Sequence, residues 1–265
     1  MTDSTALRLS GRDVLPLLHR TTSNALAELI PGNARVTLFC DFRGRLQHRA
    51  LVAVTNDGAV WLLRADAPGA ELAAAVDSMV FRDDVRIEDR SGEFSVVLAD
   101  AEPDARGVLL ERDGVPLVAA AGDGTLLALD GREALPDPVR IARLRPQHGH
   151  EIAEAFNPFE IGLGHEVHLA KGCFTGQEAL QRLITYDSVR RRPAHVQLGA
   201  PGTTLPCDIL GRGERLGVLT SRSGRDGFAV LRHEAVVDPS ELTLGDGTPV
   251  EILAAPEPAR PLGRP

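Results

Sequence analysis

Lysine is almost absent from this sequence: of its 29 lysine and arginine residues, only Lys171 is a lysine. The ammonium of lysine is compact and titratable, whereas the guanidinium of arginine is a wide planar fork that stays protonated. A chain that uses arginine elsewhere and keeps lysine here predicts a site where the larger group would not fit. We therefore expect Lys171→Arg to impair function with little loss of thermal stability.

Cysteine is also scarce. The three cysteines, Cys40, Cys173 and Cys207, are odd in number and widely spaced, and no CxxC pattern is present. These features exclude a disulfide framework and a four-cysteine zinc site, and they predict free thiols in a reducing compartment. The first residues, 1–5, lack the basic and apolar regions of a signal peptide, so we expect a cytoplasmic protein.

Long apolar runs and excess positive charge are missing as well. No run approaches the roughly 20 residues that span a bilayer, so no membrane segment is expected. The formal net charge of -8 argues against a nucleic-acid partner and against binding to an anionic membrane surface. Neither GxGxxG nor a P-loop pattern occurs. What remains is a chain of 265 residues, 43% hydrophobic, which is enough for one large or two moderate domains.

The order of the expected elements predicts an α+β fold. They are a helix within 12–29, strands over 35–42, 46–55 and 59–64, a helix over 68–79, a hairpin of 85–89 with 93–99, short strands within 107–129, and a helix from 137 to about 144. Aspartate at position 137 is a candidate cap for this last helix.

The composition changes after residue 190. Short β-like runs over 195–198, 208–210, 216–221, 228–231 and 250–253, separated by Gly and Pro turns, predict a small β-barrel or sandwich. We place an α+β region at 1–190, a barrel domain at 191–255 and a proline-rich tail at 256–265. The tail is expected to be disordered.

The octapeptide 171–178 is the strongest candidate site. Gly172 and Gly176 bracket Cys173 and allow positive φ and close approach of a ligand. A helix over 177–183 would place the thiol near its N-terminus, where the helix dipole and Lys171 would lower the pKa of Cys173. A tight loop with a buried, structural cysteine is the alternative.

Histidines offer a weaker hypothesis. His165, Glu166 and His168 suggest a metal site, but Gly162 and Gly164 disfavour a helix, and a strand would turn the two rings to opposite faces. We therefore expect no metal. The remaining isolated histidines are interpreted as surface or satisfied core residues: His19, His48, His195 and His233.

The octapeptide, Lys-Gly-Cys-Phe-Thr-Gly-Gln-Glu, resembles the signature of the YgfZ family, folate-binding relatives of the glycine-cleavage T-protein (GcvT). Three further stretches resemble segments of these proteins: 156–163, 21–24 with Pro31-Gly32, and 217–221. The resemblance implies a GcvT/YgfZ-like folate-binding fold, with interleaved α+β subdomains around a central channel and a small C-terminal barrel.

The resemblance also implies a site. Tetrahydrofolate or a one-carbon derivative would occupy the channel, and Cys173, assisted by Lys171, would be a reactive thiol on its wall. A carboxylate, Glu160 or Glu178, would accept from the pteridine. Arg190–Arg192 would contact the glutamate tail or serve only as a linker. The cofactor-binding candidates are Glu160, Gly172, Phe174, Gly176, Gln177, Glu178 and Arg182.

The family role so implied is the assembly or repair of iron–sulfur enzymes, with client enzymes or A-type assembly proteins as partners. A folate-dependent aminomethyltransferase is one alternative, and a folate-independent thiol redox or metal-handling module is another. One departure counts against the transferase. Where T-proteins carry an Asn and a required Asp, this chain has Arg64 and Glu71, and Glu71 is interpreted as a solvated helix residue.

Overall fold

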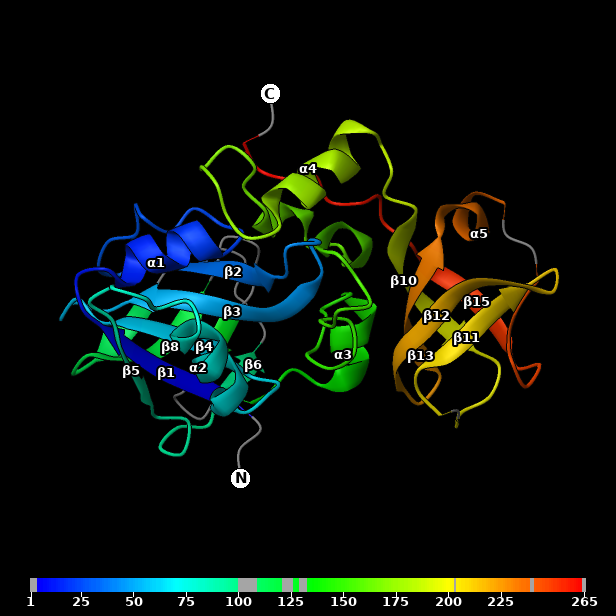
Figure 1. Ribbon diagram of the computed structural model, residues 1–265. Coiled ribbons are helices and arrows are strands. Elements are labelled where there is room, and N and C mark those ends of the chain that lie inside the picture. The colour runs from blue at the N-terminus through cyan, green and yellow to red at the C-terminus, as the bar shows by residue number, and fades with distance from the viewer. Residues whose placement is uncertain are drawn as a thin grey trace.

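A computed structural model describes residues 4–99, 109–120, 126–128, 133–202, 204–238 and 241–263. Figure 1 shows an N-terminal α+β part and a C-terminal barrel, joined by a central segment that contains α3 and α4. No helix among the described residues is long and apolar enough to cross a membrane.

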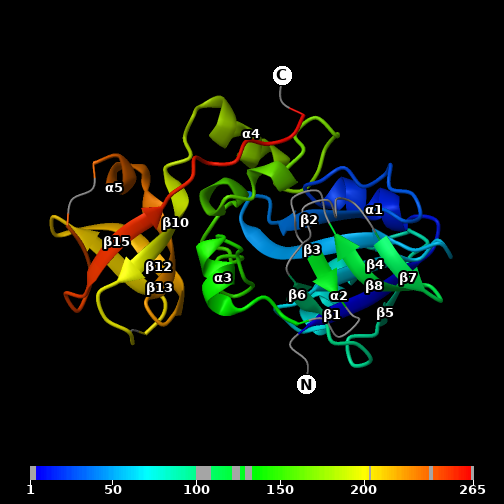
Figure 2. The ribbon, with the colours of Figure 1, turned by 180° about the vertical axis from the view of Figure 1, so that it is seen from behind.

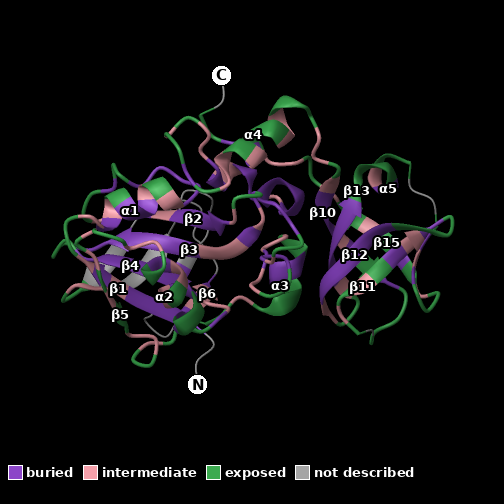
Figure 3. Ribbon diagram, viewed as in Figure 1, coloured by how far each residue is buried: buried purple, intermediate pink, exposed green. Residues whose placement is uncertain are grey.

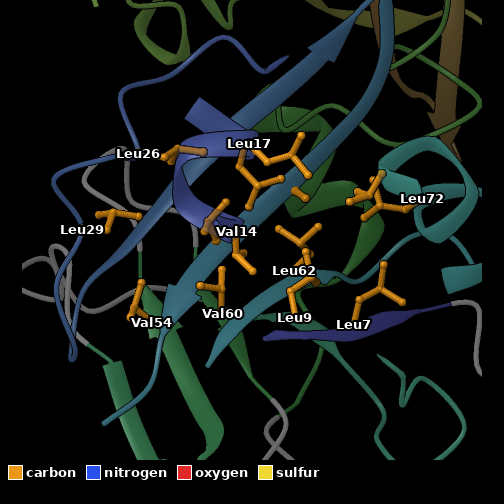
Figure 4. Packing of buried hydrophobic residues seen from close by; sticks show 14 of the residues in the cluster. Leu7, Leu9, Val14, Leu17, Leu26, Leu29, Val54, Val60, Leu62 and Leu72 are labelled. Atoms are coloured by element: carbon orange, nitrogen blue, oxygen red, sulfur yellow. The ribbon is translucent and has the colours of Figure 1, made fainter. Parts of the chain in front are cut away.

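The first sheet is antiparallel, with the strand order β2-β3-β4-β1-β5. Its strands and the two helices beside it are β1 (Thr5–Ser10), β2 (Ala34–Cys40), β3 (Leu46–Val54), β4 (Val60–Arg64), β5 (Arg86–Asp89), α1 (Val14–Thr21) and α2 (Gly69–Asp77). Helix α1 buries Val14, Leu17 and Leu18, the i, i+3, i+4 face that its sequence predicts. Figure 4 shows Val14 and Leu17 packing on Leu9 and Leu62 of the sheet.

The helix expected within 12–29 ends at Thr21. Thr22 is extended, with φ -118° and ψ 169°. Ser23 donates from its side chain to Glu166 O, and Asn24 donates from its amide to Val36 O. Short polar side chains that bond to neighbouring backbone compete with helix, so residues 22–29 form a loop instead.

A second sheet covers the opposite face of the first. Its strands, in the order β6-β9-β8-β7, are β6 (Val97–Ala99), β7 (Leu109–Arg112), β8 (Val115–Ala120) and β9 (Leu126–Ala128). Alternate residues of β4 separate the two layers: Leu62 packs toward α1, whereas Trp61 and Leu63 pack toward the second sheet. The short strands expected within 107–129 are confirmed where they are described; residues 107–108, 121–125 and 129 lie outside the described part.

The expected hairpin of 85–89 with 93–99 is wrong. Strand β5 pairs with β1 in the first sheet, whereas β6 pairs with β9 in the second. The Ser91-Gly92 turn therefore carries the chain from one layer to the other. Ser91 accepts a hydrogen bond at its side chain from Ala6 N, which holds this crossing against β1.

The central segment contains α3 (Asp137–Ala142), the short 3-10 helices η1 (Pro158–Ile161) and η2 (Gly164–Glu166), and α4 (Gln177–Thr185). Pro136, not Asp137, occupies the N-cap position of α3. A continuous apolar core joins the first sheet to the barrel through this segment, with Leu38, Phe159 and Phe228 among its members. Figure 3 shows the corresponding stretch of buried residues.

The C-terminal strands form a closed barrel in the order β10-β13-β12-β11-β14-β15. They are β10 (Arg191–Leu198), β11 (Cys207–Gly211), β12 (Glu214–Ser223), β13 (Asp226–Arg232), β14 (Leu242–Leu244) and β15 (Pro249–Ala254), with α5 (His233–Val237) after β13. The expected α+β fold with a small barrel is confirmed; β14 and α5 were not expected.

The proline-rich segment after β15 differs from the expected disordered tail. Leu262 donates from its backbone N–H to Val167 O at 2.7 Å and accepts from Leu169 N at 3.1 Å. A Cβ on Gly164 would lie 1.8 Å from Ala259 O, so the segment passes directly over η2. Figure 2 shows it running from the barrel to the α4 region.

Candidate functional site

Lys171 lies in the signature loop, residues 171–178, which leads into α4. Its Nζ donates to the backbone oxygen of His19 and lies 4.8 Å from the centre of the Phe174 ring. Partial burial lowers the pKa of Lys171 to about 8. The side chain is thus turned toward the protein.

His19 completes this contact and is satisfied, as the sequence predicts. Its Nδ1 accepts from the backbone N–H groups of Leu26 and Ala27 at 3.1 and 3.2 Å. The ring proton therefore belongs on Nε2, which donates to Lys171 O at 3.1 Å. Lys171 and His19 exchange two hydrogen bonds, and this lysine–histidine clasp ties the signature loop to α1.

Cys173 is exposed and does not line the central cavity described below. Helix α4 begins at Gln177 with Gly176 as its N-cap residue, so the thiol lies three residues ahead of the cap, not in the first turn. The buried member of the loop is Phe174, which belongs to the core that joins the sheet and the barrel. The thiol is therefore reached from the outer surface.

The other signature residues make local contacts. A Cβ on Gly176 (φ 83°) would lie 2.5 Å from Asp41 O, so glycine is needed for packing as well as for backbone conformation. Gln177 donates from its side chain to Leu169 O at 2.9 Å. Glu178 and Arg182 form the i,i+4 ion pair that their spacing predicts, with both side chains exposed. Gly172 has open space beside it.

Glu160 is buried among its own partners. Its carboxylate accepts from Asn157 N at 3.1 Å, which completes a capping box at the start of η1. Arg191 donates to both carboxylate oxygens, at 2.8 and 3.0 Å, and Arg45 lies 3.6 Å away. This carboxylate is committed to joining η1, β10 and the β2–β3 turn.

A cavity of about 190 Å³ lies where the two sheets meet α3. This central cavity has apolar walls from β3, β4, β6 and β9, and polar groups on one side. Its lining includes Leu51, Leu63, Ala65, Asp66, Leu98 and Gln147. None of the signature residues is among those that line it.

Three arginines of the cavity wall are held by other groups. Arg49 donates to both carboxylate oxygens of Glu166, with the closest pair at 2.6 Å. Arg140 donates to Arg145 O at 2.8 Å and to Asp137 at 3.0 Å. Buried Arg64 donates to Thr5 Oγ1 and to Pro68 O. Their positions are fixed before any ligand arrives.

One buried carboxylate, Glu151, connects the barrel to the loop that lines the central cavity. Its Oε1 accepts from Thr220 and Ser221 of β12 at 2.5 and 2.7 Å, and its Oε2 accepts from Gln147 N at 3.0 Å. Arg140 Nη1 lies 3.8 Å from Oε2. The Thr-Ser pair within the 217–221 resemblance therefore anchors the loop that lines the cavity.

A second hollow of about 460 Å³ adjoins this cavity and shares Ile152 with it. His48 and His148 stack there, with ring centres 5.4 Å apart, and His148 Nε2 lies 3.6 Å from the Glu71 carboxylate. Burial and Arg64 lower the pKa of His148, and burial lowers that of His48 to about 4. Glu71 is exposed, as expected, but it also lines this histidine hollow.

The sequence interpretation of His48 as isolated is therefore wrong. The partners of His48 come from segments far apart in the chain, so spacing could not reveal the cluster. Arg64 and Asp66 do carry a local signal, since Arg64 ends the apolar run of β4 and Asp66 lies two residues further on.

The histidine hollow places three potential metal ligands within 4.8 Å of one another. Arg64 Nη1, however, points at Nδ1 of His48 and of His148, at 3.2 and 3.5 Å. Both Nδ1 atoms then accept, so each Nε2 carries the ring proton and has no lone pair for a cation. His165 and His168 are not part of this cluster.

Comparisons with known proteins place the fold. No family model matches the chain. A putative chloroplastic transferase of Arabidopsis thaliana is 31% identical over 160 residues, which cover 53% of this chain and 35% of that protein. An aminomethyltransferase of Symbiobacterium thermophilum is 25% identical, over 80% of this chain and 70% of that protein. The chain thus spans about a third of the Arabidopsis relative.

A crystal structure of the glycine cleavage system aminomethyltransferase T from Bartonella henselae superposes with a TM-score of 0.75, covering 96% of this chain and 83% of that one, at 14% identity. The chain therefore has a GcvT-like fold, mixed α and β with a closed C-terminal barrel.

Proposed function

We propose that the protein binds tetrahydrofolate or a one-carbon derivative in the central cavity. The observation that carries this proposal is a partly open cavity at the junction of the two sheets and α3, in a GcvT-like fold. Leu51, Leu63 and Leu98 would cover the faces of a bicyclic ring. Sites for drug-sized ligands measure about 300–1,000 Å³. A cavity of about 190 Å³ therefore suits the pteridine alone, with the remainder of the cofactor outside.

Asp66 is the carboxylate best placed to recognise a pteridine. Its Oδ2 accepts from His148 N at 2.7 Å, which fixes the side chain and leaves further acceptor capacity facing the cavity. A pteridine presents an amino group and a ring N–H, and a carboxylate can accept from both. Asp66 thus takes the role that the sequence assigned to Glu160 or Glu178.

A titration of tetrahydrofolate, followed by calorimetry, tests the proposal. Ala65 lines the cavity, whereas Ala70 of α2 is exposed, so Ala65→Leu and Ala70→Leu are matched variants. Ala65→Leu should weaken binding at least tenfold, and Ala70→Leu should bind like the parent protein. Absence of heat at millimolar ligand with an intact fold, or equal affinity of the two variants, would contradict it.

A second candidate function is folate-dependent one-carbon transfer. Glu71 occupies the position at which the resemblance to T-proteins places a required Asp, and its carboxylate lies beside His148 in the hollow that adjoins the cavity. A carboxylate next to a neutral imidazole could exchange protons with a bound one-carbon donor. Turnover of a methylamine-type donor with tetrahydrofolate, lost in Glu71→Gln, would establish this activity; no turnover would exclude it.

For the cellular role, we propose support of iron–sulfur enzymes through Cys173. Because the thiol is exposed, it would meet a client or assembly protein from outside, not through a channel. The test is restoration of cluster-enzyme activity in cells that lack the protein. Cys173→Ser should fail and Cys207→Ser should succeed; equal success would rule out a role for this thiol.

A further inference from the structure

A groove separate from the central cavity lies where α4, the barrel and the C-terminal segment meet, a region visible in Figures 1 and 2. It measures about 720 Å³ and shares no lining residue with the central cavity. Its apolar wall includes Leu183, Ile184 and Val189. This size falls within the range of sites that bind small organic molecules.

Charge in the groove is predominantly positive. Arg190, Arg192 and Arg260 face two carboxylates, Asp187 and Glu257. Among the residues that the structure describes, neither Arg190 nor Arg260 forms an ion pair, and both are exposed. We call this site the arginine groove.

Arg192 is the buried anchor of the arginine groove, with its side chain only 4% exposed. Its Nη2 donates to His233 Nδ1, so the ring proton of His233 belongs on Nε2, a further donor. Its Nη1 donates to Glu257 Oε1 at 2.8 Å. Burying an arginine demands such partners, because an unpaired buried charge is costly.

Glu257 pairs with Arg192 at the surface of the arginine groove. Its side chain is 83% exposed, so the contact with Arg192 is made from the solvent side. An exposed side chain contributes little beyond this pair and can turn into water at small cost. A ligand anion could then take its place on Arg192 without exposing the guanidinium.

We propose that the arginine groove binds a small organic anion with an apolar body. Its carboxylate or phosphate would replace Glu257 on Arg192 and reach Arg190 and Arg260, while its apolar part would rest on Ile184 and Val189. With Glu257 displaced, three guanidinium groups would face only Asp187 and the ligand. Guanidinium groups bind carboxylate and phosphate through the same forked geometry.

Calorimetric titrations at low ionic strength with citrate, inorganic pyrophosphate and ATP test the proposal and distinguish the sources of the anion. Citrate alone would indicate a carboxylate ligand, pyrophosphate and ATP together a phosphate, and ATP alone a phosphate attached to a larger body. For the anion that binds, Glu257→Gln should increase affinity about tenfold, because it removes the competing carboxylate.

The double variant Arg190→Gln/Arg260→Gln should reduce affinity at least tenfold. Arg12→Gln is the matched control, because Arg12 is exposed and remote from the groove, and it should have no effect. Ala65→Leu should also leave binding intact, which separates this site from the central cavity. No binding of any probe at millimolar concentration, or equal affinity in the double variant and the Arg12 control, would overturn the proposal.

Discussion

At the scale of single residues, the structure gives Lys171 a specific contact. Its ammonium contacts a backbone carbonyl and an aromatic ring in a half-buried space. Such a space suits the compact ammonium of lysine better than the wide, planar guanidinium of arginine. The sequence singled out this position, since lysine occurs nowhere else. It could not supply the reason, because His19 lies 152 residues away along the chain.

Lys171→Arg should therefore lower stability, contrary to the expectation from sequence that stability would change little. The larger group would separate His19 from the loop and break the clasp, with a loss of roughly 1–2 kcal/mol. Thermal unfolding measures this, and Arg12→Lys, an exposed change of cation, is the control. A Tm of Lys171→Arg equal to that of the parent protein would contradict the clasp.

The three thiols should differ in reactivity. Cys173 is exposed, Cys207 is partly buried, and burial together with Asp41 raises the pKa of Cys40 to about 12. Since the thiolate is the nucleophile, a disulfide reagent at neutral pH should label Cys173 first and Cys40 only on unfolding. Mass spectrometry of the native protein resolves the order; early labelling of Cys40 would be inconsistent with the structure.

His48 should make the protein sensitive to acid. Burial lowers its folded-state pKa from 6.5 to about 4, so the unfolded chain binds more protons than the folded one between these values. Stability should therefore fall as the pH drops from 6.5 to 4. In His48→Asn, whose side-chain oxygen can still accept from Arg64, the fall in Tm should be about 3 °C smaller. In His150→Asn, where the replaced ring is exposed and bonds to Thr220 O through Nδ1, the fall in Tm with pH should match that of the parent protein.

At the scale of elements, the local sequence pattern predicted the strands correctly where a continuous apolar run is buried. Strand β4 and residues 50–54 of β3 are buried on both faces, and their apolar runs were recognised. The separate partners of β5 and β6 were not recognised. A turn signal does not specify whether the next strand pairs in the same sheet or in the other one. The ordered contacts of the C-terminal segment were not predicted, because a high proline content does not reveal whether the segment packs on another part of the protein. Here Leu262 bonds to the backbone of Val167 and Leu169.

Gly164 is where this C-terminal segment can be tested. In Gly164→Ala the new methyl would collide with Ala259 O, so the segment should lift from η2. Hydrogen exchange of residues 260–263 should then rise, and proteolysis there should accelerate. Gly92→Ala, with open space around it, should leave both unchanged. Identical exchange in the two variants would show that the segment is not held at Gly164.

At the scale of the whole molecule, the sequence predicted the fold, whereas the ligand site that we propose differs from the one implied by the sequence. The sequence suggested Glu160 and the signature loop as ligand contacts. In the structure, Lys171 forms the lysine–histidine clasp, Glu160 completes a capping box, and Phe174 packs in the core. The cavity is instead formed by residues from both sheets and α3, held to the barrel through Glu151. Such an assembly depends on tertiary contacts that no local spacing encodes.

The central claim is the location of the folate, and hydrogen exchange with and without tetrahydrofolate tests it most directly. The structure predicts ligand-dependent protection of the backbone at 63–66, 97–98 and 146–147, which border the central cavity. Little change is predicted at 157–163 and 171–178. Protection confined to those two segments would contradict this account and return the cofactor to the signature loop.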